Sequence, residues 1–174
     1  IVAIKESTED TRRITDIYNE LGDRFAVLSG VDDIALESMM LGAVGWISGL
    51  TSAFPKESVA IYKLASQNRY EEALEIYRWF MPLLHLDTIP SLVQCIKLCE
   101  QICGRGSETV RPPRLKLIGN EREHVSPWEM KNLEQVEARN SLYLIKENWI
   151  RISGWKRSMG SLLPTRWGDW PKCD

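Results

Sequence analysis

Short apolar segments alternate with helical segments over roughly the first 50 residues, and this alternation constrains the fold more than any other feature of the sequence. Residues 1–5 (IVAIK), 25–28 (FAVL) and 46–48 (WIS) are the short segments, and each is predicted to form a strand. Between them, residues 14–21 and 36–40 carry apolar side chains at helical spacing. Strands and helices that alternate over short connections favour a parallel sheet with helices outside it, so the predicted fold class is α/β.

Helix follows helix in the next part of the chain. The expected helices lie within residues 58–65, 70–81, 92–103 and 120–125. We therefore expect residues 1–55 to hold the sheet and residues 56–125 to add helices to the same domain.

The remaining residues, 126–174, differ in composition from the rest of the chain. They contain five of the seven tryptophans and show no clear helical or strand period. We interpret this segment as an atypical Trp-rich tail of artefactual origin, from a shifted reading frame or a vector. An extra subdomain is the alternative interpretation.

Charge and hydropathy exclude several classes of partner. The formal net charge is −2, and no cluster of Lys and Arg predicts a nucleic-acid surface. No apolar run approaches the ~18 residues of a membrane span, and the chain does not start with the basic and apolar regions of a secretory signal. These features predict a cytoplasmic protein with neither a nucleic acid nor a membrane as partner.

Three of the four cysteines, Cys95, Cys99 and Cys103, are spaced four residues apart and so share one face of a predicted helix. No second pair has the spacing of a zinc site. We therefore expect small core residues in a reducing compartment and no metal, with a metal or redox role as the alternative.

Polar residues and glycines gather where the predicted strands end, which is the edge that carries the chemistry in parallel α/β folds. Lys5 ends the first strand, and a lysine nucleophile must be unprotonated although its ordinary pKa is about 10.4. Partial burial in the mouth of a barrel lowers that pKa, because burial disfavours the charged form. A strand-end lysine that extends into water is the alternative.

The second and third strands are also followed by candidate binding residues. Gly30 allows close approach of the backbone, and Asp32, with Asp33 beside it, offers acceptors for substrate hydroxyls or caps a helix. Ile47 and Ser48 offer backbone groups and a hydroxyl to a substrate, or serve only the turn. Further along the chain, His85 and Asp87 lie between two helices, where we expect a structural role in the turn.

Taken together, these segments resemble the dihydrodipicolinate synthase/N-acetylneuraminate lyase family. IVAIKES resembles its Schiff-base strand, and VLSGVDD and LGAVGWISGLTSAFP follow at matching spacing, so the resemblance covers residues 1 to about 125. It implies a partial (β/α)8 TIM barrel, of which residues 1–5, 25–29 and 46–48 are strands six to eight, followed by a C-terminal helical bundle.

The same resemblance implies roles for individual residues. Lys5 is the expected imine-forming lysine. The residue matching Ile47 presents its backbone to the bound keto acid, and Gly30 and Asp32 line the same mouth. No cofactor is implied, because the Schiff base itself acts as the electron sink. The implied parent enzyme is a homodimer or homotetramer that takes a small keto or imino acid.

Within the family, RYEEALEIYRWFMPLLHLD, LVQCIKL and GRGSETVRPPRL resemble 1-pyrroline-4-hydroxy-2-carboxylate deaminases of hydroxyproline degradation. This implies conversion of the cyclic imino acid to 2,5-dioxopentanoate and ammonia. A dihydrodipicolinate synthase-like enzyme or a keto-acid aldolase, each using pyruvate, is the alternative activity. Two further alternatives are a truncated, non-catalytic fragment, since the family's carboxylate loop and relay tyrosine belong to earlier strands, and a binding module built from the helices and the tail.

Overall fold

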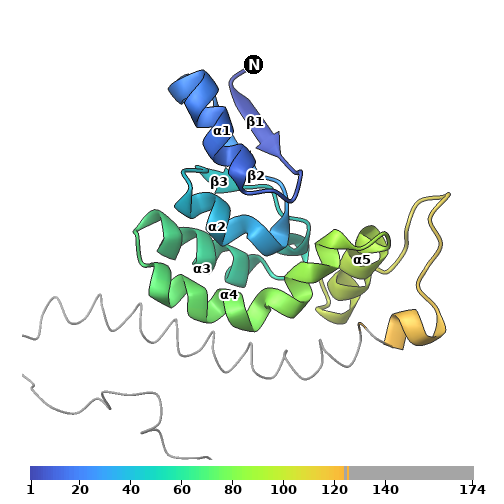
Figure 1. Ribbon diagram of the computed structural model, residues 1–174. Helices are drawn as coiled ribbons and strands as arrows, with labels where there is room; N and C mark the ends of the chain where they lie inside the picture. Colours follow the sequence, from blue (N-terminus) through green and yellow to red (C-terminus); the bar gives the residue numbers. More distant parts are fainter. Residues whose placement is uncertain (124, 126–174) are drawn as a thin grey trace, which may run out of the picture. The chain divides into compact units, whose positions relative to one another are not determined.

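A parallel three-stranded sheet organises the first part of the chain. The computed structural model describes residues 1–123 and 125, so the predicted Trp-rich tail, residues 126–174, lies outside the described residues. The strands are β1 (Ala3–Glu6), β2 (Ala26–Ser29) and β3 (Gly45–Trp46), in the order β1-β2-β3. Helices α1 (Arg12–Leu21) and α2 (Ala35–Met40) connect them (Figure 1). The predicted alternation and the parallel sheet are therefore confirmed.

The register of the sheet brings the ends of the strands together. Lys5 pairs with Leu28, and Ser29 pairs with Trp46. The third strand is shorter than the predicted residues 46–48, although the Ile47 N–H still donates to the Ser29 carbonyl at 2.8 Å. All three strands thus end at one edge of the sheet, and Lys5 lies at that edge.

The alternative interpretation, that Asp32 and Asp33 cap a helix, is wrong. They begin a single 3-10 turn, Asp32–Ile34, and α2 then starts without a side-chain cap. The physical reason is that both carboxyls bond to groups far away in the sequence. The two carboxyls therefore form long-range hydrogen bonds and do not cap the helix that follows them.

Three longer helices follow the sheet, as predicted. They are α3 (Pro55–Ser66), α4 (Tyr70–Leu84) and α5 (Leu92–Ile102). Proline at the first position of α3 suits a helix start, because its missing N–H has no partner there in any helix. Asn68, with φ of +58°, makes the tight turn between α3 and α4, since asparagine tolerates the left-handed region better than most residues. Residues 119–123 are helical, close to the predicted final helix.

The core lies where α2, α3 and α4 pack against one another (Figure 1). The largest fully buried side chains include Tyr77, Phe80, Ile61, Leu84 and Leu50. Cys95 and Cys99 are buried on α5, as predicted for small core residues, and Cys103 is half-buried. In the part of the chain that the structure describes, no helix is both long and apolar enough to cross a membrane.

Candidate active site

Lys5 stands at the carboxyl end of β1 with its side chain exposed. Within residues 1–123 and 125, no hydrogen bond or ion pair engages its ammonium group. The expected burial in a barrel mouth is absent, because three strands leave the strand end open to solvent. The amine is therefore accessible to a carbonyl compound, which is the first requirement for imine formation.

Gly30 lies directly against the stem of Lys5. Its N–H donates to the Glu6 carbonyl at 2.7 Å. A Cβ built at residue 30 would lie 2.7 Å from Lys5 Cε and 2.8 Å from the Glu6 carbonyl oxygen, and closer still to Ser7 Oγ. Contacts below 3.0 Å require some atom to move, and the carbonyl belongs to the paired β1 backbone. The absence of a side chain at residue 30 therefore leaves space for the Lys5 stem.

Asp32 supports this edge from inside the protein. Its side chain is fully buried, and its two carboxyl oxygens accept hydrogen bonds from Trp46 Nε1 at 2.8 Å and from the Leu50 N–H at 3.0 Å. The carboxyl thus joins the end of β3 to the turn that precedes α3. A direct contact between Asp32 and a ligand, as the resemblance implies, would require this buried carboxyl to become accessible.

The residues after β3 lie at the same edge. Ile47 is 50% exposed, and its N–H is already bonded to the Ser29 carbonyl. A backbone contact from Ile47 to a ligand would therefore use the Ile47 carbonyl oxygen. Ser48 is half-buried, and its Oγ accepts a hydrogen bond from the Thr51 N–H at 3.1 Å. Ser48 therefore stabilises the turn, and its hydroxyl remains able to donate.

Asp87 also lies at this edge, a position that the sequence analysis did not predict when it gave Asp87 a structural role in the turn. It belongs to the 3-10 turn His85–Thr88 after α4, and its Oδ2 accepts a hydrogen bond from the Asp32 N–H at 3.0 Å. Beside it, His85 Nδ1 lies 2.8 Å from Asp33 Oδ2. The predicted structural role in the turn is consistent with both bonds. No local pattern reveals the position, because Asp87 and Asp32 are 55 residues apart.

The electrostatic surroundings of Asp87 include Lys5. Burial raises the pKa of the Asp87 carboxyl, and the charges of Asp32 and Asp33 act in the same direction. The hydrogen bond from the Asp32 backbone and the positive charge of Lys5 lower the pKa, and the net shift is upward. The charge of Lys5 thus acts on the Asp87 carboxyl, although no ion pair within 4.0 Å joins these two described residues.

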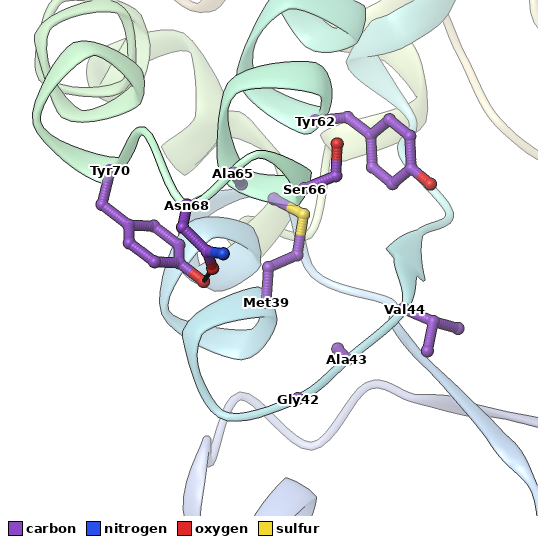
Figure 2. Close-up of a pocket in the computed structure, with 9 residues that line it drawn as sticks. All are labelled: Met39, Gly42, Ala43, Val44, Tyr62, Ala65, Ser66, Asn68 and Tyr70. Atoms are coloured by element: carbon purple, nitrogen blue, oxygen red, sulfur yellow. Dashed lines mark hydrogen bonds between the residues drawn. The ribbon is translucent and has the colours of Figure 1, made fainter.

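A separate hollow of about 200 Å³ lies at the opposite edge of the sheet (Figure 2). Its lining includes residues 42–44, which precede β3, and the turn between α3 and α4. The Tyr70 hydroxyl donates to Asn68 Oδ1 at 3.3 Å on its rim. Because the amino ends of parallel strands lie away from their carboxyl ends, this hollow takes no part in the Lys5 site.

Comparison with known proteins points to one family. The model of the dihydrodipicolinate synthetase family matches residues 1–129. The chain is 37% identical over 108 residues to the 4-hydroxy-tetrahydrodipicolinate synthase of Aquifex aeolicus, a match that covers 58% of this chain and 37% of that protein. The chain thus spans well under half the length of this curated relative.

Solved structures give the same result. The dihydrodipicolinate synthase of Aquifex aeolicus is similar with a TM-score of 0.65 and 31% identity, covering 80% of this chain and 45% of that one. The chloride-inhibited dihydrodipicolinate synthase of Acinetobacter baumannii, solved in complex with pyruvate, is similar with a TM-score of 0.64 and 27% identity, covering 74% and 44%. The similarity therefore extends to the fold as well as the sequence.

Proposed function

This chain belongs to the dihydrodipicolinate synthetase family, and from that membership we propose that Lys5 forms an imine with pyruvate. The proposed activity is that of a Schiff-base lyase that uses pyruvate, and the similar synthase of Acinetobacter baumannii was solved in complex with pyruvate. The observation that carries it is the position of Lys5: an accessible amine at the carboxyl end of β1, with Gly30 leaving space for its stem. The α/β fold resembles that of dihydrodipicolinate synthases and includes part of a parallel sheet.

The proposed chemistry needs no cofactor. The Lys5 ammonium first releases one proton to solvent, and the free amine then bonds to the carbonyl carbon of pyruvate. The carbonyl oxygen leaves as water with one amine proton and one proton from solvent. The product is a protonated imine, which retains the other amine proton. Its positive nitrogen accepts the electron pair released when the neighbouring methyl group loses a proton, so the enamine forms next.

We keep the 1-pyrroline-4-hydroxy-2-carboxylate deaminase as a second candidate. It is favoured by the segments within residues 69–115 that resemble those deaminases. The relatives compared above are named as synthases, which favours pyruvate. Assembly of the parent enzyme as a homodimer or homotetramer and a cytoplasmic location belong to the same proposal.

Trapping with borohydride distinguishes the candidates. The folded chain is incubated with pyruvate or with 1-pyrroline-4-hydroxy-2-carboxylate, reduced, and measured by intact-mass spectrometry, with Lys5→Met as the matched control. We expect one reduced pyruvate per chain and a clear loss of the adduct in Lys5→Met. An adduct formed with the cyclic imino acid alone would favour the deaminase. No Lys5-dependent adduct with either compound would mean that this chain is not catalytic by itself.

Substitution of Gly30 tests the space that it leaves for Lys5. In Gly30→Ala the new methyl group meets the Lys5 stem and the β1 backbone. We expect Lys5-dependent trapping of pyruvate to slow by roughly tenfold or more, because misplacement of a reacting group by about 1 Å is costly. The rate of adduct formation, measured by intact mass, provides the check.

Gly45→Ala is the matched control for this substitution. Its new methyl group meets only side chains, the end of Leu28 at 3.1 Å and the ring of Tyr62 at 3.9 Å. Trapping in this variant is expected to remain near the wild-type rate. Equal rates in Gly30→Ala and the wild type would contradict the proposed contact between Gly30 and Lys5.

A further inference from the structure

A chain of contacts leads from Lys5 to Asp87. The Lys5 stem lies against Gly30, two residues before Asp32. The Asp32 N–H then donates to Asp87 Oδ2 at 3.0 Å, while Asp87 Oδ1 lies 3.6 Å from the position of a Cβ at Gly49. Asp87 is half-buried at this place. Its carboxyl is therefore held at the strand edge by the Asp32 N–H, and its other oxygen lies near Gly49.

The charges around Asp87 come from several elements. Asp32 and Asp33 lie on the turn after β2, and Lys5 lies at the end of β1. His85, on the same turn as Asp87, bonds to Asp33. Helices α4 and α5 pack against this turn. On α4, the charged residue nearest to the turn in sequence is Arg78. On α5, Lys97 and Glu100 form an ion pair with each other at 2.6 Å. Among the residues whose charges most affect the pKa of Asp87, Lys5 is the positively charged one.

We propose that Asp87 is an electrostatic partner of the imine at Lys5: held by the Asp32 backbone at the strand edge that carries Lys5, its carboxylate keeps the imine protonated. This inference rests on the proposed imine. The ammonium and the protonated imine carry the same charge at nearly the same place, so Asp87 leaves the step between them almost unchanged. It opposes the later loss of the imine proton to solvent, and only the protonated imine is an effective electron sink.

Exchange of the pyruvate methyl protons in D2O tests the inference. Exchange is followed by proton NMR as a function of pD in the wild type and in Asp87→Asn, and the exchange that persists in Lys5→Met is subtracted. We expect the alkaline midpoint of the Lys5-dependent exchange to fall in Asp87→Asn by about 0.3–0.7 pH unit. This corresponds to a coupling of about two- to fivefold, as expected for a solvent-screened charge pair.

Three features separate this role from a structural one. The asparagine oxygen can still accept the Asp32 N–H, so the fold is expected to persist in Asp87→Asn. Asp87→Glu restores the charge and is expected to restore the midpoint. Asp23→Asn, which removes an exposed carboxyl before β2, is the matched control and is expected to leave the midpoint unchanged. A purely structural role would lower exchange at every pD without moving its midpoint.

Titration of the Asp87 carboxyl by carbon-13 NMR provides a measurement that does not depend on pyruvate. The pKa of Asp87 is expected to rise in Lys5→Met, because the charge of Lys5 lowers it in the wild type. An unchanged Asp87 titration in Lys5→Met would overturn the inference. An exchange midpoint in Asp87→Asn equal to that of the wild type would also overturn it. Both outcomes leave the proposed function standing. A wild type without any Lys5-dependent exchange would instead overturn the proposed function, and this inference with it.

Discussion

Asp32→Ala is expected to lower the free energy of unfolding by roughly 2–6 kcal/mol, because two donors lose their acceptor and each costs about 1–3 kcal/mol. These donors are Trp46 Nε1 and the Leu50 N–H, which bond to the fully buried Asp32 carboxyl. Urea unfolding at neutral pH, followed by circular dichroism, measures the change. The edge of the sheet that carries Lys5 is thus expected to depend on a residue that faces away from solvent.

Two further variants make the Asp32 result specific. Asp32→Asn keeps one acceptor and is expected to lose roughly half as much stability. Asp33→Ala removes a bond to the largely exposed His85 and is expected to cost less than about 1 kcal/mol. If Asp32→Ala proved as stable as the wild type, the two hydrogen bonds would contribute no net stability, which would contradict the supporting role given to Asp32.

Phe80→Ala is expected to lower the free energy of unfolding by about 3–5 kcal/mol, the usual cost of removing a large buried ring. Phe80 is fully buried on α4. Its ring meets Phe54 edge to face at a centroid distance of 5.4 Å and stacks with Trp79 at 5.8 Å. The same urea titration measures this loss, which arises from the cavity as well as from the lost apolar burial.

A matched aromatic substitution checks the origin of the Phe80 effect. Tyr62→Ala removes a ring from α3 that is 41% exposed, and surface changes of this kind usually cost little. We expect its loss to be well below that of Phe80→Ala. Similar, small losses in both variants would contradict the packing of α3 against α4 around Phe80.

The sequence predicted the helices and strands well, because each is specified mostly by residues that are close together in the chain. The apolar run before Lys5 predicts a strand, and the position of the lysine at its end follows directly. The expectation that Gly30 allows close approach of the backbone agrees with the contact between Gly30 and Lys5. These features depend on residues that are near one another in sequence or on adjacent strands.

The features of the site that the sequence did not predict depend on contacts between segments that are far apart in the chain. Asp32 resembles a helix cap, yet its oxygens bond to Trp46 and Leu50 across the sheet edge. Asp87 reaches the same edge from the turn after α4, and no periodicity predicts that approach. The solvent exposure of Lys5 likewise depends on what surrounds the end of β1, which its own segment does not encode.

Mapping of the trapped adduct tests the central claim most directly. Trypsin cleaves after lysine and arginine, but not after a lysine that carries the reduced pyruvate. The wild-type chain is reduced with borohydride in the presence of pyruvate, digested and analysed by tandem mass spectrometry. We predict an adduct on Lys5, seen as an uncleaved peptide that runs from Ile1 to Arg12. An adduct confined to the amino group of Ile1, on a peptide cleaved after Lys5, or to other lysines would contradict the account.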